Sequence, residues 1–290
     1  MPADPPLIVP RSLVEALEVL AAQGPRARVV AGGTVAVADF NRRRRIPEVL
    51  IPIGRLEELR QIRQEDGCLA IGAGVSFAML RDSALVQQQA PLLAEAASLF
   101  HGPAIQAMAT LGGNLATAHN AADGSVVLLA LDAEVVLRGL DGERRVAVAG
   151  LFLDLWRTVC RPEELIVEIR VPCPTGGTGA HFIKRGPLST GLPVVSAAAC
   201  LGLEAGRLRE ARIGLGALAP TPVRARQAEA LLAGNVPDDE ALAAAGQAAL
   251  VGTSPVSDRR GSAWYRRQVA PVIVRRALEG ARQRALAAVS

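Results

Sequence analysis

Two short stretches constrain this fold most, residues 30–34 (VAGGT) and residues 110–114 (TLGGN). In each, apolar residues lead into two adjacent glycines followed by a small polar residue. Adjacent glycines let the backbone approach a bulky ligand and turn its N–H groups toward it. An ordinary turn at the end of a strand gives the same pattern, so one such stretch alone is a weak signal. Together they predict two ligand-facing loops suited to phosphate groups.

The first stretch lies inside a predicted β-α-β unit. Ser12 and Glu15 form a capping-box pattern that begins a helix, and Gly24-Pro25 ends it. Strands are expected over residues 29–31 and 49–53, with a short helix over 35–41 between them. The glycines therefore lie between a strand and a helix, where helix N-terminal amides can face an anion.

The rest of the chain reads as mixed helix and strand. A strand is expected over 68–74, a helix capped by Ser76 over 77–89, another over 91–100, a break at 101–103 and a buried helix over 125–131. Asp141-Gly142 predicts a hairpin. After a proline- and glycine-rich boundary at 173–179 we expect strands over 182–185, 194–203 and 212–219. Helices are expected over 226–233, 240–250 and 264–287, the last with an interruption at Pro271. This is an α+β fold in two domains, 1–173 and 174–290.

Composition excludes several classes of protein. The 290 residues are 50% hydrophobic with a net charge of +4, which favours a globular chain and argues against nucleic-acid binding. No apolar run reaches the roughly 18 residues of a membrane span, and the N-terminus lacks a signal-peptide pattern, so we expect a cytoplasmic protein. The four cysteines and three histidines lack metal-ligand spacing, which predicts no metal site. P-loop and Rossmann motifs are absent, and no catalytic constellation stands out.

Basic side chains give two further hypotheses. Lys184 is the only lysine among 32 basic residues, which suggests a position that needs a compact ammonium group. Residues 42–45 are four consecutive arginines, which form either a solvated face or a contact with an acidic partner.

Several motifs carry a resemblance over nearly the whole length. In chain order they are AGGT at 31–34, IGAG at 71–74, ATLGGN at 109–114, ALDA at 130–133, EELI at 163–166 with Val171-Pro172, GLGA at 214–217, and SDRRGS at 257–262 with YRR at 265–267. In these segments the chain resembles the FAD-binding medium subunit of the molybdenum hydroxylases, the xanthine dehydrogenase and carbon monoxide dehydrogenase family. The resemblance implies a two-lobed FAD-binding domain of the PCMH, vanillyl-alcohol-oxidase-like type, followed by a small α+β domain of the CO dehydrogenase flavoprotein type.

The resemblance also implies the FAD-binding residues. Backbone amides of the two glycine stretches would hold the pyrophosphate, Asp123 would bind ribose hydroxyls or cap a helix, and Lys184 would reach the flavin. Phe100 would lie beside the cofactor or in the core, and Ile166 against the flavin. The full set is Val29, Val30, Ala31, Gly32, Gly33, Thr34, Val35, Ala36, Phe100, Thr110, Leu111, Gly112, Gly113, Asn114, Asp123, Ile166 and Lys184.

Three departures from the family pattern concern the electron acceptor. The chain has Gln106-Ala107 where the family usually has Arg-Asn, and His119-Asn120 where it usually has Ser-Pro. Residues 186–191 (GPLSTG) replace the usual charged residues after Lys184. These changes leave the identity of the acceptor open. His119 is a candidate for covalent flavin attachment, and an exposed loop histidine is the simpler interpretation.

The function implied by the resemblance is that of an oxidoreductase subunit. A molybdopterin-containing large subunit would hydroxylate the substrate, a small subunit with two [2Fe-2S] clusters would relay electrons, and FAD in this chain would pass them to NAD, oxygen or another acceptor. The assembly would be a dimer of heterotrimers. Two alternatives are a free-standing FAD-dependent oxidase or dehydrogenase and a non-enzymatic nucleotide-binding module. The substrate stays open among purines, aldehydes, carbon monoxide and N-heterocycles.

Overall fold

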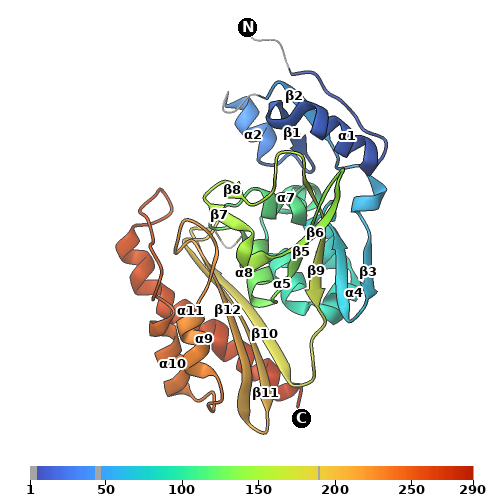
Figure 1. The fold of residues 1–290 in the computed structure, drawn as a ribbon. Coiled ribbons are helices and arrows are strands. Elements are labelled where there is room, and N and C mark those ends of the chain that lie inside the picture. Colours follow the sequence, from blue (N-terminus) through green and yellow to red (C-terminus); the bar gives the residue numbers. More distant parts are fainter. Residues whose placement is uncertain (1–4, 43–46, 189, 290) are drawn as a thin grey trace.

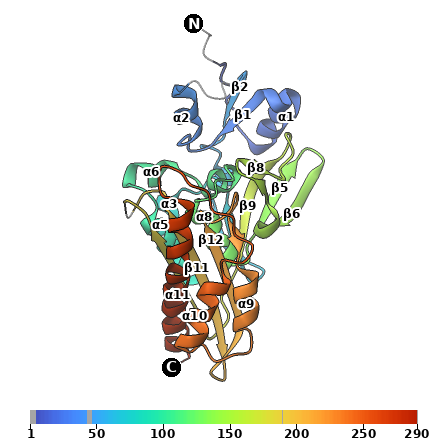
Figure 2. The same ribbon diagram turned by 90° about the vertical axis from the view of Figure 1, so that its left-hand side faces the viewer.

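The computed structural model describes residues 5–42, 47–188 and 190–289. Three parts follow one another along the chain (Figure 1): an N-terminal lobe in blue, a central part in cyan and green, and a C-terminal part in yellow to red. Figure 2 shows the C-terminal part in front of the central part, below the N-terminal lobe. The α+β class is confirmed, since helices pack on antiparallel sheets in the central and C-terminal parts.

The N-terminal lobe contains the predicted β-α-β unit. Helix α1 (Leu13–Gln23) precedes parallel strands β1 (Ala27–Val30) and β2 (Val49–Pro52), which flank α2 (Ala36–Asn41). Ser12 caps α1 by accepting from the Glu15 N–H, but the Glu15 carboxylate accepts from the N–H of Arg11, one residue before the position a capping box requires. Of the predicted arginine cluster only Arg42 is described; Arg43, Arg44 and Arg45 lie outside the described residues.

The central part is a five-stranded antiparallel sheet with helices on one side. In spatial order its strands are β3 (Ile62–Glu65), β4 (Cys68–Gly72), β9 (Leu165–Pro172), β5 (Glu134–Gly139) and β6 (Gly142–Ala147). Its helices are α3 (Phe77–Asp82), α4 (Ala84–Gln89), α5 (Pro91–Leu99), α6 (Pro103–Met108), α7 (Leu111–Ala116) and α8 (Asp123–Ala130), followed by the small hairpin β7 (Phe152–Asp154) and β8 (Arg157–Thr158). The predicted hairpin at Asp141-Gly142 joins β5 to β6.

Side-chain capping explains where the central helices differ from expectation. The single helix expected over 77–89 is two helices, because the Ser83 hydroxyl accepts from the Val86 N–H and starts α4. Residues 110–114, expected as a loop, are the start of α7, because Thr110 accepts from the Gly113 N–H. Helix α6 was not predicted.

The C-terminal part is a four-stranded antiparallel sheet between two layers of helices. In order its strands are β10 (Thr178–Arg185), β11 (Val195–Glu204), β12 (Arg207–Gly216) and β13 (Val223–Arg224), and its helices are α9 (Arg226–Leu232), α10 (Asp239–Ala248) and α11 (Ala263–Ala287). One face of the sheet packs on α5 and α8, so that Phe182 and Ala198 belong to the central hydrophobic core. The other face packs on α9, α10 and α11. Each face of the sheet therefore contributes side chains to a different hydrophobic core.

Helix α11 runs without interruption through Pro271, contrary to expectation. A proline inside a helix costs about 3 kcal/mol. The same helix buries Ile273, Val274 and Leu278, and each fully buried aliphatic side chain contributes about 1.5–3 kcal/mol. Burial therefore outweighs the proline. No helix in the described part of the chain combines the length and apolar character needed to cross a bilayer.

Candidate functional site

The first glycine stretch presents unpaired backbone donors. Gly33 has φ of +72°, a left-handed conformation that glycine adopts without strain. Gly32 lies against the end of α6, where an added Cβ would stand 1.7 Å from the Met108 carbonyl oxygen. Among the described residues, none accepts a hydrogen bond from the N–H groups of residues 32–36. Five consecutive free donors form a backbone surface suited to an anion.

The second glycine stretch differs from expectation, because its amides are paired within the protein. The four bonds run from Leu111 to Val75 O, from Gly112 to Ala73 O, from Gly113 to Thr110 Oγ1 and from Asn114 to Thr110 O. These N–H groups form the first turn of α7 and its packing on the loop after β4. What remains for a ligand here is side-chain chemistry, chiefly the Asn114 amide, whose Oδ1 is buried and has no hydrogen-bond partner in the described chain.

The two stretches lie in one continuous band with Asp123. Gly32 contacts Met108 and Ala109, directly before the second stretch. At the other end of that stretch, Asn114 Oδ1 lies 2.7 Å from where a Cβ on Gly124 would be, beside Asp123. Residues some 90 positions apart in sequence are thus linked by close approaches that run from the N-terminal lobe into the central part.

Asp123 and Lys184 form a buried ion pair at the end of this band. Lys184 Nζ, on β10, donates to Asp123 Oδ2 at 2.6 Å, and the two side chains are 3% and 4% exposed. Asp123 is the first residue of α8, and its side chain does not cap that helix. Burial raises the pKa of Asp123 to about 6, although Lys184 partly opposes the rise. The structure thus places the ammonium group of the sole lysine in a buried ion pair at one end of the band.

Several polar atoms around the pair lack partners. Asp123 Oδ1 and the hydroxyls of Ser125 and Ser196 are buried without a hydrogen bond to any described residue. Ser196 lies directly opposite Lys184 in the β10–β11 ladder. Buried polar groups are ordinarily satisfied, so a cluster of exceptions indicates a place for a polar ligand or ordered water. Periodicity could not have identified Ser196, because its role depends on cross-strand register.

Phe100 belongs to the central core and also adjoins this band. Its ring stacks on Phe77 with centroids 3.7 Å apart, and Phe77 lies beside Gly124, where an added Cβ would be 3.3 Å from the Phe77 ring. His101 meets the Phe100 ring edge-on, and burial together with the charge of Lys184 lowers its pKa. His101 was not predicted as a site residue.

Gln106 explains one departure from the family pattern. It is 4% exposed, and its Nε2 donates to the Phe100 carbonyl at 2.8 Å. This bond fixes the turn that carries Phe100 and His101. Gln106 therefore supports the candidate site from behind Phe100 and His101. In the sequence it was noticeable only because Gln106-Ala107 replaces the Arg-Asn that is usual in the family.

Ile166 is a buried residue of β9, connected to the second stretch through the backbone. The neighbouring Val167 carbonyl accepts from the Ala73 N–H, and the Ala73 carbonyl accepts from the Gly112 N–H.

A cavity of about 740 Å³ beside the first stretch is lined by Ala31, Gly32 and Thr110 among others. Its size lies within the roughly 300–1,000 Å³ of small-molecule sites.

His119 is half-buried, so the expectation of an exposed loop histidine is wrong. Its Nδ1 accepts from the Ala121 N–H, and its ring meets Trp156 edge-on at 5.0 Å. Burial and the charge of Arg260 lower its pKa to about 4, so the ring is neutral at neutral pH. These contacts hold His119 between the β7–β8 hairpin and the C-terminal part.

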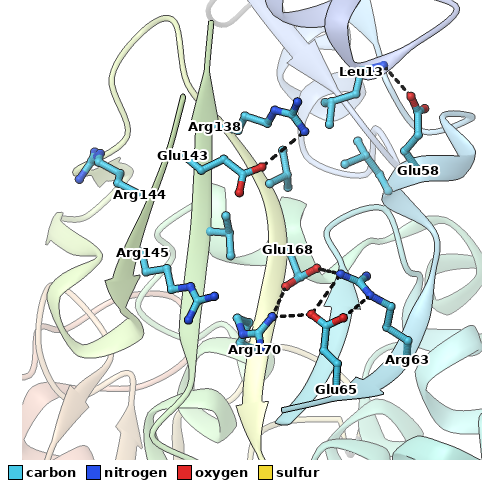
Figure 3. Close-up of a pocket in the computed structure, with 13 residues that line it drawn as sticks. Leu13, Glu58, Arg63, Glu65, Arg138, Glu143, Arg144, Arg145, Glu168 and Arg170 are labelled. Carbon is cyan, nitrogen blue, oxygen red and sulfur yellow. Dashed lines mark hydrogen bonds and ion pairs between the residues drawn. The ribbon is translucent and has the colours of Figure 1, made fainter. Parts of the chain in front are cut away.

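A second cavity, of about 570 Å³, lies away from this band between the N-terminal lobe and the five-stranded sheet (Figure 3). Its charged lining includes Arg63, Glu65, Glu168 and Arg170, which form a cross-strand network of ion pairs. The pairs of Arg63, whose side chain is 47% exposed, contribute little to stability, whereas Arg170 and Glu168 are largely buried. None of the predicted site residues lines it.

The donor set of the band suits a dinucleotide better than a metal. Free amides can bind phosphate, an unpaired carboxylate oxygen can accept from hydroxyls, and an ammonium can face a negatively charged ring. No group of three or more potential metal-binding side chains occurs among the described residues. The residues present therefore fit FAD, and the N–H groups of the first stretch are the best-suited phosphate donors.

Comparison with known protein families points to the same cofactor, FAD. Residues 4–174 match the FAD binding domain in molybdopterin dehydrogenase, and residues 189–281 match the CO dehydrogenase flavoprotein C-terminal domain.

Individual relatives cover almost the whole chain. The 6-hydroxypseudooxynicotine dehydrogenase complex subunit alpha of Paenarthrobacter nicotinovorans is 38% identical over 279 residues, covering 96% of this chain and 94% of the relative. The carbon monoxide dehydrogenase medium chain of Hydrogenophaga pseudoflava is 35% identical, with 94% and 95% covered. A solved structure of carbon monoxide dehydrogenase from H. pseudoflava, lacking the Mo-pyranopterin moiety, superposes with a TM-score of 0.95 at 36% identity, covering 98% of this chain and 99% of that one. The chain therefore belongs to the family of FAD-binding medium subunits of the molybdenum hydroxylases.

Proposed function

We propose that this chain binds FAD noncovalently along the band from the first glycine stretch to Lys184 and uses it to transfer electrons within a heteromeric molybdenum hydroxylase. The observation that carries the proposal is the alignment of free donors at residues 32–36 with the buried Asp123–Lys184 pair. Bound FAD would supply the redox chemistry, namely uptake of two electrons one at a time and their release as a pair. The chain supplies binding, orientation and charge.

Each end of the band has its own task. The amides of Gly32, Gly33 and Thr34 would bind the pyrophosphate, and the unpaired Oδ1 of Asp123 would accept from ribose hydroxyls. Lys184 provides a positive charge that favours the more negative, reduced form of the flavin. Phe100 and Ile166 supply apolar surface near the same edge.

The partners and boundaries in this proposal come from the family. We propose a molybdopterin-containing large subunit that selects and hydroxylates the substrate and a small subunit with two [2Fe-2S] clusters, assembled as a dimer of heterotrimers in the cytoplasm. NAD, oxygen or another carrier accepts the electrons. The FAD-binding domain would span residues 1–173 and the C-terminal domain residues 174–290.

The direct test is release of the chromophore. The purified protein should be yellow, contain one FAD per chain and release the flavin to the supernatant on acid precipitation, because no bond from His119 or a cysteine is expected. Absorbance spectra and mass analysis of the supernatant and the pellet show whether the flavin is released or stays bound to the protein. Flavin that stays with the pellet would contradict noncovalent binding, and a protein without flavin would favour the nucleotide-binding module.

A further inference from the structure

Glu95 joins two parts of the molecule through four hydrogen bonds. It lies on α5 in the central part, and its carboxylate accepts from His181 Nδ1 at 2.8 Å and from the Phe182 N–H at 3.2 Å, both on β10. Arg284, on α11, donates to the same carboxylate with both terminal nitrogens, at 2.8 and 3.0 Å. One side chain thus fastens α5 to the edge strand and the last helix of the C-terminal part.

The cluster is charged and closely packed. Burial alone would raise the pKa of Glu95, but the bonds from His181 and Arg284 outweigh burial and lower it to about 2. The carboxylate is therefore ionised at any physiological pH. Gly280 lets α11 approach the His181 ring, since a Cβ there would lie 2.3 Å from it, and Arg284 also donates to the Ala180 carbonyl at 2.6 Å.

This cluster lies next to Lys184 on the same strand. The Phe182 N–H that Glu95 holds is two residues from Lys184, and the Phe182 side chain is 1% exposed in the central core. Strand β10 is therefore tied to the central part twice, by Glu95 on α5 and by Asp123 on α8. It is an edge strand, paired only with β11 among the described strands, so these ties limit its movement away from the central part.

We propose that Glu95 is a positioning residue for the redox site: by holding β10 against α5, it sets where the Lys184 ammonium lies relative to the bound flavin. This inference rests on the proposed role of Lys184. Loss of the Glu95 charge weakens the hold of α5 on the middle of β10, at His181 and Phe182, and the ammonium then spends part of its time farther from the flavin. The flavin potential should fall, because the positive charge that favours the reduced form is weaker.

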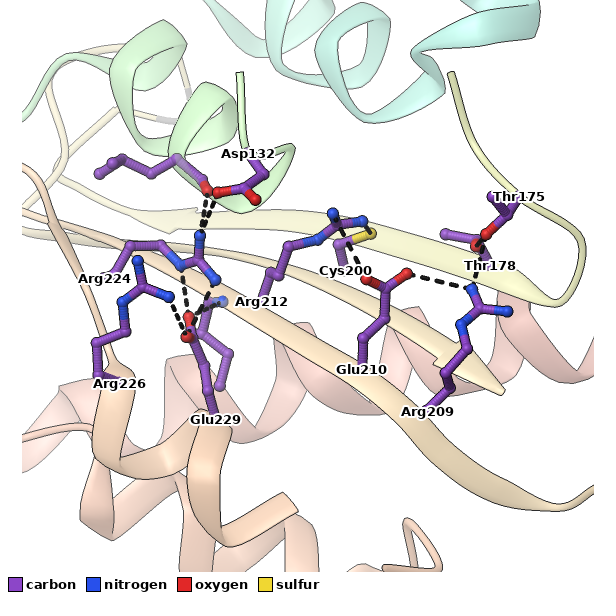
Figure 4. A network of polar contacts seen from close by, with 12 residues as sticks. Asp132, Thr175, Thr178, Cys200, Arg209, Glu210, Arg212, Arg224, Arg226 and Glu229 are labelled. Carbon is purple, nitrogen blue, oxygen red and sulfur yellow. Dashed lines mark hydrogen bonds and ion pairs between the residues drawn. The ribbon is translucent and has the colours of Figure 1, made fainter. Parts of the chain in front are cut away.

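The test compares Glu95→Gln with Glu229→Gln in the full chain, purified in its native complex. Glu229 is a matched control: its carboxylate is buried and accepts from the Ile213 N–H and from Arg224, but it lies beside β13 at the opposite edge of the same sheet (Figure 4). Both variants should retain FAD and lower the unfolding temperature of the complex. Only Glu95→Gln should lower the flavin midpoint potential, by less than Lys184→Ala does. Arg284→Gln removes part of the same cluster, so it should lower the flavin midpoint potential by a smaller amount than Glu95→Gln.

The double variant shows whether Glu95 acts through Lys184. In a Lys184→Ala background, Glu95→Gln should cause no further shift of potential. An unchanged potential in Glu95→Gln and Arg284→Gln, or an equal shift with and without Lys184, would overturn the inference while leaving the proposed function intact. A Lys184→Ala variant with the wild-type potential would instead remove Lys184 from the proposed function, independently of whether FAD is bound.

Discussion

At the residue scale, the site depends on backbone conformation and on one buried pair of charges. Gly33 takes φ of +72° in the stretch whose N–H groups have no partner among the described residues, and Asp123 and Lys184 form an ion pair in a region almost closed to solvent. Neither feature involves a reactive side chain. Changes at these positions should therefore alter binding, potential or stability rather than remove a chemical step.

Gly33→Ala should reduce FAD occupancy while the protein remains folded. A left-handed conformation costs a residue with a Cβ about 1–2 kcal/mol, and the new methyl would meet only side-chain atoms, of Val37 at 3.2 Å and of Val30 at 3.6 Å. The backbone of the first stretch would adopt a different conformation, so its N–H groups would no longer point toward the phosphate. Gly67→Ala is the control, because Gly67 has the same φ of +72° in the β3–β4 turn with open space around it. Equal flavin content in both variants would show that the first stretch does not hold FAD.

Lys184→Met should destabilise the FAD-free protein more at about pH 8 than at about pH 5. Asp123 already has a raised pKa, and without the ammonium its burial is unopposed. A folded-state pKa above the unfolded value means that stability is present at low pH and is lost as pH rises through the folded pKa. Leaving the carboxylate charged and unpaired costs about 3–5 kcal/mol.

Urea unfolding at the two pH values measures this difference. The double variant Lys184→Met with Asp123→Asn removes both charges, so it should recover most of the loss and reduce the pH dependence. A pH-independent loss in Lys184→Met would mean that the pair is not the cause.

At the element scale, the start of α11 is fixed by one buried arginine. Arg266 is fully buried and donates to the carbonyls of Val194 and Ala217 and to the Asp258 carboxylate. The Val194 N–H closes the turn after β10 by donating to the Arg185 carbonyl. The SDRRGS and YRR motifs thus have a structural task, namely holding the ends of three strands together.

Arg266→Met should lower the free energy of unfolding, because it leaves two buried carbonyl groups without their donor, at about 1–3 kcal/mol each, whereas Asp258 keeps its bonds from Arg260. Arg267→Met changes the same side chain one residue later, on the exposed face of the helix. The control should stay within about 0.5 kcal/mol of wild type in chemical denaturation. Similar losses in both variants would contradict the assignment to Arg266.

At the scale of the whole molecule, the described residues fit a redox cofactor, and no constellation of catalytic side chains stands out among them. The described residues include no potential metal site, and the titratable groups of the band are a buried ion pair and partly buried histidines. We expect electrons to reach the flavin from another subunit of the heteromeric enzyme.

Expressed alone and loaded with FAD, the chain should oxidise no purine, aldehyde or N-heterocycle, yet its flavin should still exchange electrons with NADH or an artificial dye. Steady-state assays with each substrate class, before and after addition of the partner subunits, test this. Substrate turnover by the isolated, metal-free chain would support the free-standing FAD-dependent oxidase or dehydrogenase instead.

The sequence by itself determined the elements and much of the identity of this protein. Apolar periodicity and capping residues such as Ser12 and Ser76 predicted most helices and strands, because these signals act within one or two turns. The motifs identified the family, and Lys184 stood out in the sequence as the only lysine; its proposed role beside the flavin stays a prediction.

Only the tertiary structure decided how these residues combine. Which amides are free depends on what the rest of the fold pairs: Val75 and Ala73 occupy the donors of the second stretch, whereas those of residues 32–36 have no partner among the described residues. The Asp123–Lys184 pair and the Glu95 cluster join segments separated by 61 to 189 positions. Local patterns carry no information about such contacts, because the hydrophobic packing of β10 against α5 and α8 creates them.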